Sequence, residues 1–435
     1  MKKIVKAVAV AGALAAPAVA FAQASTVQIY GQMYSGYDQV SASGATAGPG
    51  GPSPQYASRG RIPSNSALIG FRGSENLGGG LRAIWQVENQ LSIDGVGGNN
   101  TQTMANGWNT RTTFVGMTGG FGQVLVGFLN PPRRQFGSMV ALVPGSTGTL
   151  VANTLLSAVN IGAVFRPLNV ATNTTTNTFG TGTGGLANNI GTIFRSQGVS
   201  YTTPTFNGFK AEIMYTPDES RDNTAVGAGQ AQRAAKLWNL GLNYDRGPLR
   251  MKMSYAKLDD WTLQTRTSAQ LTALGLTGAD KTEQWMLGAG YALGGGTTVA
   301  GLFQRATLDL AQSGGLGDLS IRRDLWLLRA RHDVGPHGFV ASYARFGDNS
   351  VSGRALAANT TYGNSGADTF GLRYSYSFSK RTQVGVDYAE LRNKANGNYF
   401  IGVSPMFPGG TGGGAGVVNA GADPRIISIN LYHSY

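Results

Sequence analysis

The segment IISINLYHSY, residues 426–435, alternates between apolar and polar positions along almost its whole length. One parity holds Ile427, Ile429, Leu431, His433 and Tyr435. A period of two residues is the pattern of a β-strand with one face in an apolar environment. The end of a chain is usually the frayed part of a domain. A regular strand that ends on an aromatic ring instead predicts a finished structural element.

Segments of the same kind recur along the chain, each of roughly ten residues and each bounded by Gly, Asn, Ser or Pro. With the last strand the count is sixteen. The predicted strands are 26–38, 67–73, 81–91, 111–117, 121–128, 195–202, 209–216, 237–244, 249–256, 283–292, 297–306, 324–332, 338–346, 369–378, 382–391 and 426–435. Two of them, 297–306 and 338–346, alternate poorly, so their facing is left open.

The connections between these strands are short and long in strict turn, seven short and eight long. Short turns at one end and long loops at the other, with an even strand number, are typical of a bacterial outer-membrane β-barrel. Hydrocarbon offers no partner to a backbone N–H group, so such a sheet has to close on itself. We therefore predict an all-β, sixteen-stranded antiparallel barrel whose last strand pairs with its first. The alternative, a large soluble β-sandwich, predicts mixed connection lengths.

In this barrel Ile427, Ile429 and Leu431 are expected to face lipid. Tyr435 would lie in the lower aromatic girdle, where a ring can be half in water, and would anchor the closing strand during assembly. Phe378 and Tyr388 are predicted to lie in the girdles as well.

The N-terminal residues 1–22 predict a cleaved signal peptide, because a basic head precedes an apolar run and the cleavage signal Ala20-Phe21-Ala22. An uncleaved membrane anchor is the alternative. The barrel would then occupy residues 23–435. The chain has no cysteine, 65 glycines, 13% charged residues and a formal charge of +13. Such a basic excess is common in nucleic-acid-binding proteins, but export argues against a nucleic-acid partner.

Two stretches, ALIGFRGSENLGGGLRAIWQVE (67–88) and NTRTTFVGMTGGFGQVLVGF (109–128), together with the His-x-aromatic ending, resemble the general-diffusion porins of Gram-negative outer membranes, in their betaproteobacterial branch. The resemblance implies a homotrimer, contacts with outer-membrane lipid and lipopolysaccharide, and a third loop folded inward as a constriction. Leu68 and Phe128 stand where the family commonly has arginine, so the details of a basic ladder along the pore wall remain open.

The longest connection within the barrel, residues 129–194, is the candidate constriction loop. Its apolar stretch 148–159 favours insertion and packing, whereas the stretch 173–185 could equally be a flexible surface segment. No Asp or Glu occurs between Asp94 and Glu212, although 22 acids in 435 residues predict about six in 117. A loop without carboxylates cannot form a cation-preferring constriction, so an anion preference is predicted.

Ten basic residues are the candidate pore-lining set. Arg111 and Arg195 open strands at positions that match family arginines facing the constriction. The others lie in the loop or on the strand parity opposite the apolar residues, where a charge avoids a cost of roughly 2–4 kcal/mol at mid-membrane. For any one of them the alternative is a rim position that binds lipopolysaccharide phosphate, or pairing with an internal carboxylate such as Asp387. The other eight are Arg133, Arg134, Arg166, Arg250, Lys252, Arg329, Arg331 and Arg373.

No motif for enzymatic chemistry is found. The three histidines, His332, His337 and His433, are placed at the membrane edge or beside a short turn, and no nucleophile, metal-ligand or phosphate-binding motif accompanies them. No cofactor and no enzymatic activity are predicted. Two functions remain: a water-filled channel for passive diffusion of small polar or anionic solutes, or a plugged barrel that acts as a receptor or adhesin through its long loops.

Overall fold

The structure is a computed structural model of the chain. It describes residues 26–45, 56–63, 67–91, 93, 111–140, 196–217, 236–259, 276–312, 318–353, 363–397, 399, 401 and 420–435. The predicted signal peptide, residues 1–22, lies outside these ranges, as do the stretches 148–159 and 173–185 of the candidate constriction loop.

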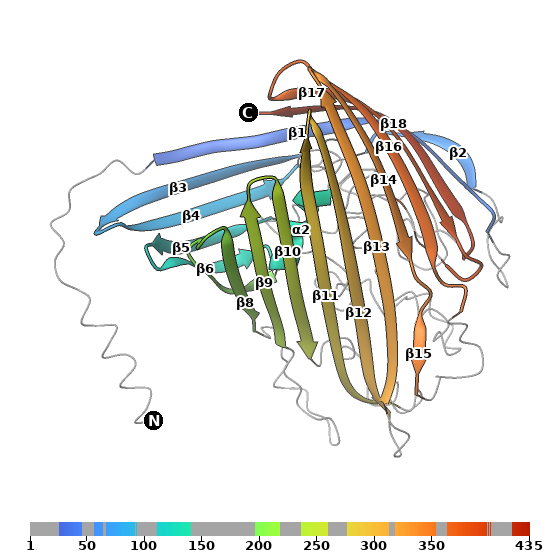
Figure 1. The fold of residues 1–435 in the computed structure, drawn as a ribbon, viewed down its shortest axis with the longest axis horizontal. Helices are drawn as coiled ribbons and strands as arrows, with labels where there is room; N and C mark the ends of the chain where they lie inside the picture. Colours follow the sequence, from blue (N-terminus) through green and yellow to red (C-terminus); the bar gives the residue numbers. More distant parts are fainter. Residues whose placement is uncertain are drawn as a thin grey trace.

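The described residues form one closed antiparallel sheet (Figure 1). Its strands are β1 (Thr26–Ser43), β2 (Tyr56–Arg61), β3 (Leu68–Gly78), β4 (Leu81–Gln90), β5 (Thr113–Gly119), β6 (Gly122–Leu129), β7 (Ser196–Thr202), β8 (Phe209–Thr216), β9 (Lys236–Arg246), β10 (Leu249–Asp259), β11 (Leu276–Gly294), β12 (Thr297–Gln312), β13 (Asp318–Val334), β14 (His337–Phe346), β15 (Ser350–Ser352), β16 (Ala367–Ser377), β17 (Thr382–Asn393) and β18 (Asp423–Ser434). Two short helical elements, η2 (Pro132–Gln135) and α2 (Phe136–Val140), follow β6.

Sixteen of these strands form the wall, and the predicted count is confirmed. The two short strands do not add to the circle: β2 pairs with the part of β1 beyond β3, and β15 pairs with the part of β13 beyond β14. In the circle of strands, β2 therefore continues the place of β3 beside β1, and β15 continues the place of β14 beside β13. Within the described ranges, no helix has the length and apolarity needed to cross a bilayer.

The last strand closes the wall against the first, as predicted. β18 pairs with β1 over twelve residue pairs, from Gln32 with Ser434 to Ser43 with Asp423. The backbone of Tyr435 extends this ladder, since its N–H donates to the carbonyl of Gly31 at 3.1 Å and its carbonyl accepts from the N–H of Gly31 at 3.3 Å. Figure 1 shows the chain end lying beside β1.

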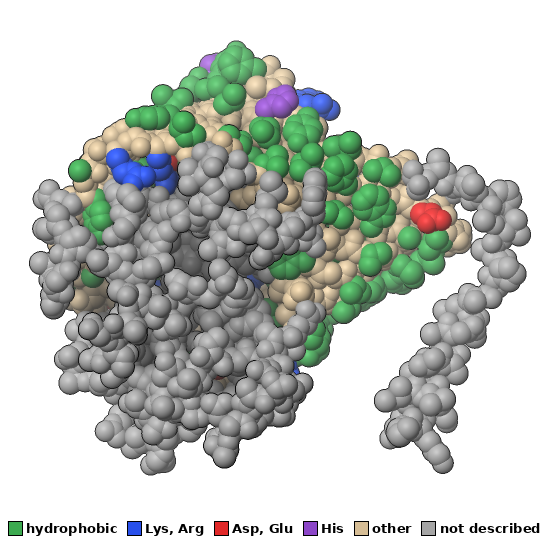
Figure 2. Space-filling model, turned by 180° about the vertical axis from the view of Figure 1, so that it is seen from behind, with side chains coloured by type: hydrophobic (Ala, Val, Ile, Leu, Met, Phe, Trp, Pro, Cys, Tyr) green, Lys and Arg blue, Asp and Glu red, His purple; other side chains and the backbone are tan. Residues whose placement is uncertain are grey.

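The outer face of the wall is apolar, and Figure 2 shows hydrophobic side chains spread over it. Ile427, Ile429 and Leu431 are 51–58% exposed on this face, whereas Ser428 and Asn430 between them are buried on the inner face. Exposure of large apolar groups over a whole barrel surface fits lipid as the surrounding solvent.

Cross-strand aromatic pairs mark one edge of this apolar band. Three pairs of rings lie 4.4–4.5 Å apart on neighbouring strands: Tyr215 with Trp238, Tyr255 with Trp285, and Phe303 with Trp326. Towards the long loops, the next outward pair on β12 and β13 is charged, with Arg305 and Asp324 2.7 Å apart. At the opposite edge, Phe378 lies 67% exposed beside the short turn and its ring is 5.1 Å from that of Tyr376.

Beyond the Arg305–Asp324 pair, β12 and β13 reverse their polarity. The inward residues Leu308, Leu310, Leu319 and Ile321 are almost fully buried, and the outward ones are polar. Both strands are therefore longer than the predicted 297–306 and 324–332, and the connection between them shrinks to 313–317. The poor alternation of 297–306 has another cause, because the inward residues Ala300 and Leu302 are apolar. Leu302 belongs to the cluster that contains Phe136 of α2, and Ala300 packs against it.

A row of buried charges crosses the closing seam on the inner face. In register order across five strands it contains Arg61, Asp38, Ser428, Asp387 and Arg373. Arg61 lies 3.0 Å from Asp38, and Arg373 lies 2.7 Å from Asp387 with both side chains 1% exposed. Each buried carboxylate thus has its own arginine, which is the arrangement that makes a buried charge tolerable.

Removing one member of this row should weaken the barrel. Arg373→Met leaves Asp387 buried without its cation, and the loss of unfolding free energy is expected to be about 3–5 kcal/mol. The measurement is the temperature at which the folded band shifts mobility in detergent gels. Arg373→Met combined with Asp387→Leu should recover most of the loss, because no lone charge remains. Equal stability of the single variant and the wild type would contradict this account of the seam.

Candidate pore constriction

The chain after β6 turns into the barrel. Glycines on the inner wall leave room for it: a Cβ at Gly241 would lie 2.6 Å from Cβ of Pro132, and one at Gly288 would lie 3.0 Å from Sδ of Met139. Phe136, at the start of α2, is 1% exposed and belongs to the apolar cluster on the inner wall. Figure 1 shows α2 inside the ring of strands. The described start of the long connection is therefore packed within the lumen.

Polar contacts fix this segment to three strands of the wall, β8, β11 and β13. The guanidinium of Arg133 donates to Oε1 of Gln284 at 3.4 Å, and the amide of Gln135 donates to Oε2 of Glu212 at 2.5 Å. From the wall, Nη1 of Arg329 donates to the carbonyl of Met139 at 2.9 Å. Together with the ring of Phe136, these contacts hold η2 and α2 against the wall strands β8 to β13.

Two arginines of η2 bring positive charge into the lumen. Arg133 is 3% exposed, and burial lowers its pKa to about 10. A pKa near 10 still leaves the guanidinium charged at neutral pH. Arg134, the next residue, is partly exposed. Both arginines at the start of the candidate constriction loop therefore lie inside the barrel.

Arg111 lies on the inner wall just before β5, but its charge is balanced. Its Nε donates to Oε1 of Glu88 at 2.6 Å and its Nη1 donates to Oε1 of Gln90 at 3.1 Å. Tyr30 also donates to Glu88, at 3.3 Å. Residues 95–211 contain no carboxylate of their own, but Glu88 on the neighbouring strand β4 pairs with Arg111. The linear sequence did not indicate this pairing.

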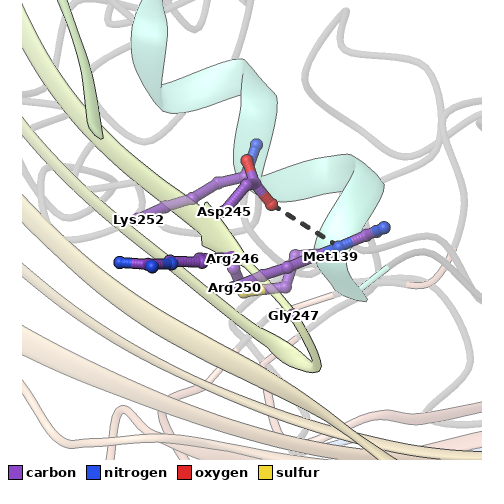
Figure 3. A pocket seen from close by; sticks show the side chains of 6 residues that line it. All are labelled: Met139, Asp245, Arg246, Gly247, Arg250 and Lys252. Carbon is purple, nitrogen blue, oxygen red and sulfur yellow. Dashed lines mark ion pairs between the residues drawn. The ribbon is translucent and has the colours of Figure 1, made fainter. Parts of the chain in front are cut away.

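Basic residues of β8, β9 and β10 line the inner wall below α2. Lys210 and Lys252 flank Asn243 in one register row. A cavity of about 490 Å³ lies here, and Figure 3 shows its lining: Met139, Asp245, Arg246, Gly247, Arg250 and Lys252. Arg250 is 3.5 Å from Asp245 with both side chains exposed, so solvent weakens this pair. No ion pair of Lys210 or Lys252 occurs among the described residues.

The remaining predicted residues fall into two groups. Arg331 is paired with Asp333 at 2.7 Å near the short turn, and Arg373 belongs to the seam row, paired with the carboxylate Asp387. Arg166 and Arg195 lie outside the described residues. The structure thus gathers Arg133, Arg134, Arg250, Lys252 and Arg329 around η2 and α2 and sets Arg331 and Arg373 apart from them.

Sequence reasoning missed the residues that seat the loop. Gly241, Gly288 and Gly290 occupy inward positions of β9 and β11, where a Cβ would meet the loop or the next strand. Glycine at inward positions of neighbouring strands is a signal of close approach by another segment, and it was available in the sequence. Glu88, Glu212 and Gln284 carry no such signal, because their partners are remote in the chain.

Each of the three histidines lies beside a hydroxyl group, which for His337 is that of Tyr374 at 2.9 Å. His332 and His433 each contact a threonine hydroxyl, Thr297 at 2.8 Å and Thr382 at 2.9 Å, and both are exposed. In the part of the chain that the structure describes, no three His, Asp or Glu residues come together as metal ligands would.

Comparison with known proteins gives a consistent picture. The sequence profile of the Gram-negative porins matches residues 7–396. Outer membrane porin protein 32 of Delftia acidovorans is 28% identical over 375 residues, which cover 86% of this chain and 85% of that protein. Major outer membrane protein P.IA of Neisseria meningitidis serogroup B is 26% identical over 427 residues, covering 89% and 95%.

Solved structures show the same fold. The anion-selective porin from Comamonas acidovorans superimposes with a TM-score of 0.63 at 23% identity, covering 94% of this chain and all of that one. OmpT of Vibrio cholerae, in its trimer form, superimposes with a TM-score of 0.55 at 14% identity, with the same coverage.

Proposed function

Because the chain belongs to the Gram-negative porins, a family of outer-membrane diffusion channels, we propose that it admits small polar solutes with a preference for anions. A barrel of sixteen strands is too wide for its own side chains to fill, so water occupies the lumen. Selectivity then depends on the charges at the narrowest part of that lumen.

The observation that carries the proposal is the excess of positive charge around α2. Arg133 and Arg134 come from the loop, and Lys210, Lys252 and Arg329 come from the wall. Two carboxylates lie among them: Glu212, which accepts a hydrogen bond from Gln135, and Asp245, which is 3.5 Å from the further cation Arg250. Charges surrounded by low-dielectric walls attract counter-ions more strongly than they do in bulk water. That a porin of the same fold is described as anion-selective supports the proposal.

The constriction itself is proposed to be the loop 129–194. Its described start, Pro131 to Val140, lies against the inner wall, and the carbonyl of Met139 is held by Arg329. Arg166 and Arg195 are predicted to join the basic set. We also propose a homotrimer in contact with lipopolysaccharide, supported by family membership and by the trimeric form of one structural neighbour. Native mass spectrometry of the detergent-extracted protein tests the trimer.

The test of the preference is the reversal potential of the purified channel in a planar bilayer across a dilute KCl gradient. The expected result is a reversal potential with the sign of a chloride-selective channel. Its magnitude should fall towards zero in 1 M salt, because the Debye length there is about 3 Å. A potassium preference in dilute KCl would refute the proposed selectivity. Absence of any conductance would instead favour the alternative, a plugged barrel that acts through its loops.

A further inference from the structure

A second basic position lies in the extracellular half of the lumen, away from η2 and α2. The inner face of β13, from its extracellular end to the level of the aromatic girdle, contains Leu319, Ile321, Arg323, Leu325 and Leu327, none more than 3% exposed. Arg323 is the one charged side chain in this series. It lies where the inner surface is otherwise the apolar core of the protruding strands.

Among the described residues, the guanidinium of Arg323 has one hydrogen-bond partner. Its Nη1 donates to the hydroxyl oxygen of Tyr399, and its central carbon lies 5.2 Å from the centroid of the Tyr399 ring. Nε and Nη2 are buried and have no hydrogen-bond partner among the described residues. A planar cation with two unused N–H groups is costly in such surroundings. The same two N–H groups can donate parallel hydrogen bonds to the two oxygens of a planar anion.

The neighbouring carboxylates are occupied elsewhere. Asp348 accepts from Lys394 at 2.8 Å and from the backbone N–H of Gly366 at 2.8 Å. Asp324, next to Arg323 in sequence, points outward and pairs with Arg305 at 2.7 Å. None of the ion pairs formed by the described residues includes Arg323. Among the described residues, the charge of Arg323 is therefore not matched by a carboxylate.

Tyr399, the partner of Arg323 among the described residues, is held in place from several sides. The amide of Asn393 donates to the carbonyl of Tyr399 at 2.9 Å and its oxygen accepts from the backbone N–H of Tyr399 at 2.9 Å. The ring of Phe346 lies 4.5 Å from the Tyr399 ring. The phenol is thus preorganised beside the guanidinium, and burial raises its pKa, so it remains a neutral hydroxyl.

We propose that Arg323 and Tyr399 form a binding site for monocarboxylates that carry an apolar group, such as benzoate. The two free N–H groups match the two oxygens of a carboxylate. The surrounding leucine, isoleucine and phenylalanine side chains favour an apolar body and penalise a strongly hydrated dianion such as phosphate, which would lose more water than the site replaces. The inference rests on the proposed function in one respect, that solutes enter the lumen.

The experiment measures how added sodium benzoate reduces the single-channel current of the full-length protein in 1 M KCl, compared with sodium acetate and sodium phosphate. Benzoate is expected to act saturably, at roughly tenfold lower concentration than acetate or phosphate, as expected for one additional favourable contact. Equal potency of benzoate and phosphate would overturn the assignment of ligand class.

The variant Arg323→Gln removes the cation and is expected to raise the half-effective benzoate concentration by roughly tenfold or more. The matched control is Arg322→Gln, because Arg322 is the adjacent residue, carries the same charge and lies exposed on the opposite face. It should leave the benzoate effect unchanged. If both variants respond to benzoate like the wild type, the site is refuted.

Arg323→Lys covers the case in which the glutamine variant does not assemble. It keeps the charge but loses the planar fork, so weaker benzoate binding supports the proposal and unchanged binding overturns it. The chloride preference in dilute KCl is measured on the same channels and should not change, since the basic residues around α2 remain. A channel that lacks anion preference but still loses its benzoate effect on Arg323→Gln would refute the proposed selectivity and leave this site standing.

Discussion

Gly31→Val is expected to block assembly of the barrel as fully as deletion of Tyr435. Both ladder bonds of the terminal residue go to Gly31, and the Tyr435 ring lies over this glycine. A Cβ at Gly31 would also stand 2.6 Å from the carbonyl oxygen of Leu68 on β3, which cannot move without disturbing the sheet. The added side chain would therefore separate β1 from both of its neighbours at the closing seam.

The effect of losing the ring alone can be estimated. A tyrosine side chain that is half buried contributes about 2 kcal/mol, which corresponds to roughly a thirtyfold shift in the equilibrium of closure. Deletion of Tyr435 or Tyr435→Asp should thus lower the amount of heat-modifiable protein in the outer membrane by more than tenfold. The readout is the amount of compact, unboiled band on detergent gels.

A matched control is available on β12. Gly301 is also outward-facing in mid-strand, but a Cβ there would meet its nearest neighbour, Cδ2 of Leu328, at an ordinary 3.4 Å. Gly301→Val should therefore assemble at close to the wild-type level. Equal losses for Gly31→Val and Gly301→Val would mean that strand glycines in general, and not the seat of the terminal residue, limit assembly.

The second large effect expected is a change of ion preference in the double variant Lys210→Glu with Lys252→Glu. The two lysines lie in one row on the inner wall on either side of Asn243, and Lys252 lines the cavity below α2. The double substitution changes the charge of the lumen by four units, and at 0.1 M salt such charges act over a Debye length of about 10 Å. The reversal potential should move from the chloride to the potassium side of zero.

The same charge change outside the lumen is the control. Lys380 and Arg381 are exposed in the turn between β16 and β17. Lys380→Glu with Arg381→Glu should leave the sign of the reversal potential unchanged. If the lumen variant keeps its chloride preference, these lysines do not govern selectivity and the basic residues of the loop must be considered instead.

The fold could be predicted from sequence because each wall strand has lipid on its outer face and the water-filled lumen on its inner face. That difference imposes a period of two on the side chains, and the strand count and the closing pair follow from it. Boundaries were less predictable where the outer solvent changes along one strand. On β12 the outward residues pass from Phe303 to Arg305 to Asp309, so a search for one alternating parity stops too early.

The site was less predictable, because it depends on contacts between remote residues. Parity placed Arg329 and Lys252 on the inner wall, but it could not show that Arg329 holds the carbonyl of Met139. It likewise could not distinguish Arg373, paired with Asp387 in the seam, from an arginine available to a solute. Register across the sheet decides these roles, and register between distant strands is not encoded in local periodicity.

The polarity reversal on β12 and β13 sets how far the barrel rises above the lipid. From Phe303 in the aromatic girdle to the end of β12 at Gln312 are nine residues (312 − 303). At about 3.3 Å per residue and a tilt near 40°, this distance is roughly 23 Å along the membrane normal. The described ends of β12 and β13 therefore stand clear of the bilayer, and the two strands have their own apolar packing there (Figure 1). This part of the barrel should therefore accept an inserted sequence. A peptide inserted at 313–317 should be accessible to antibodies on intact cells, because the paired strands β12 and β13 that hold it stay folded.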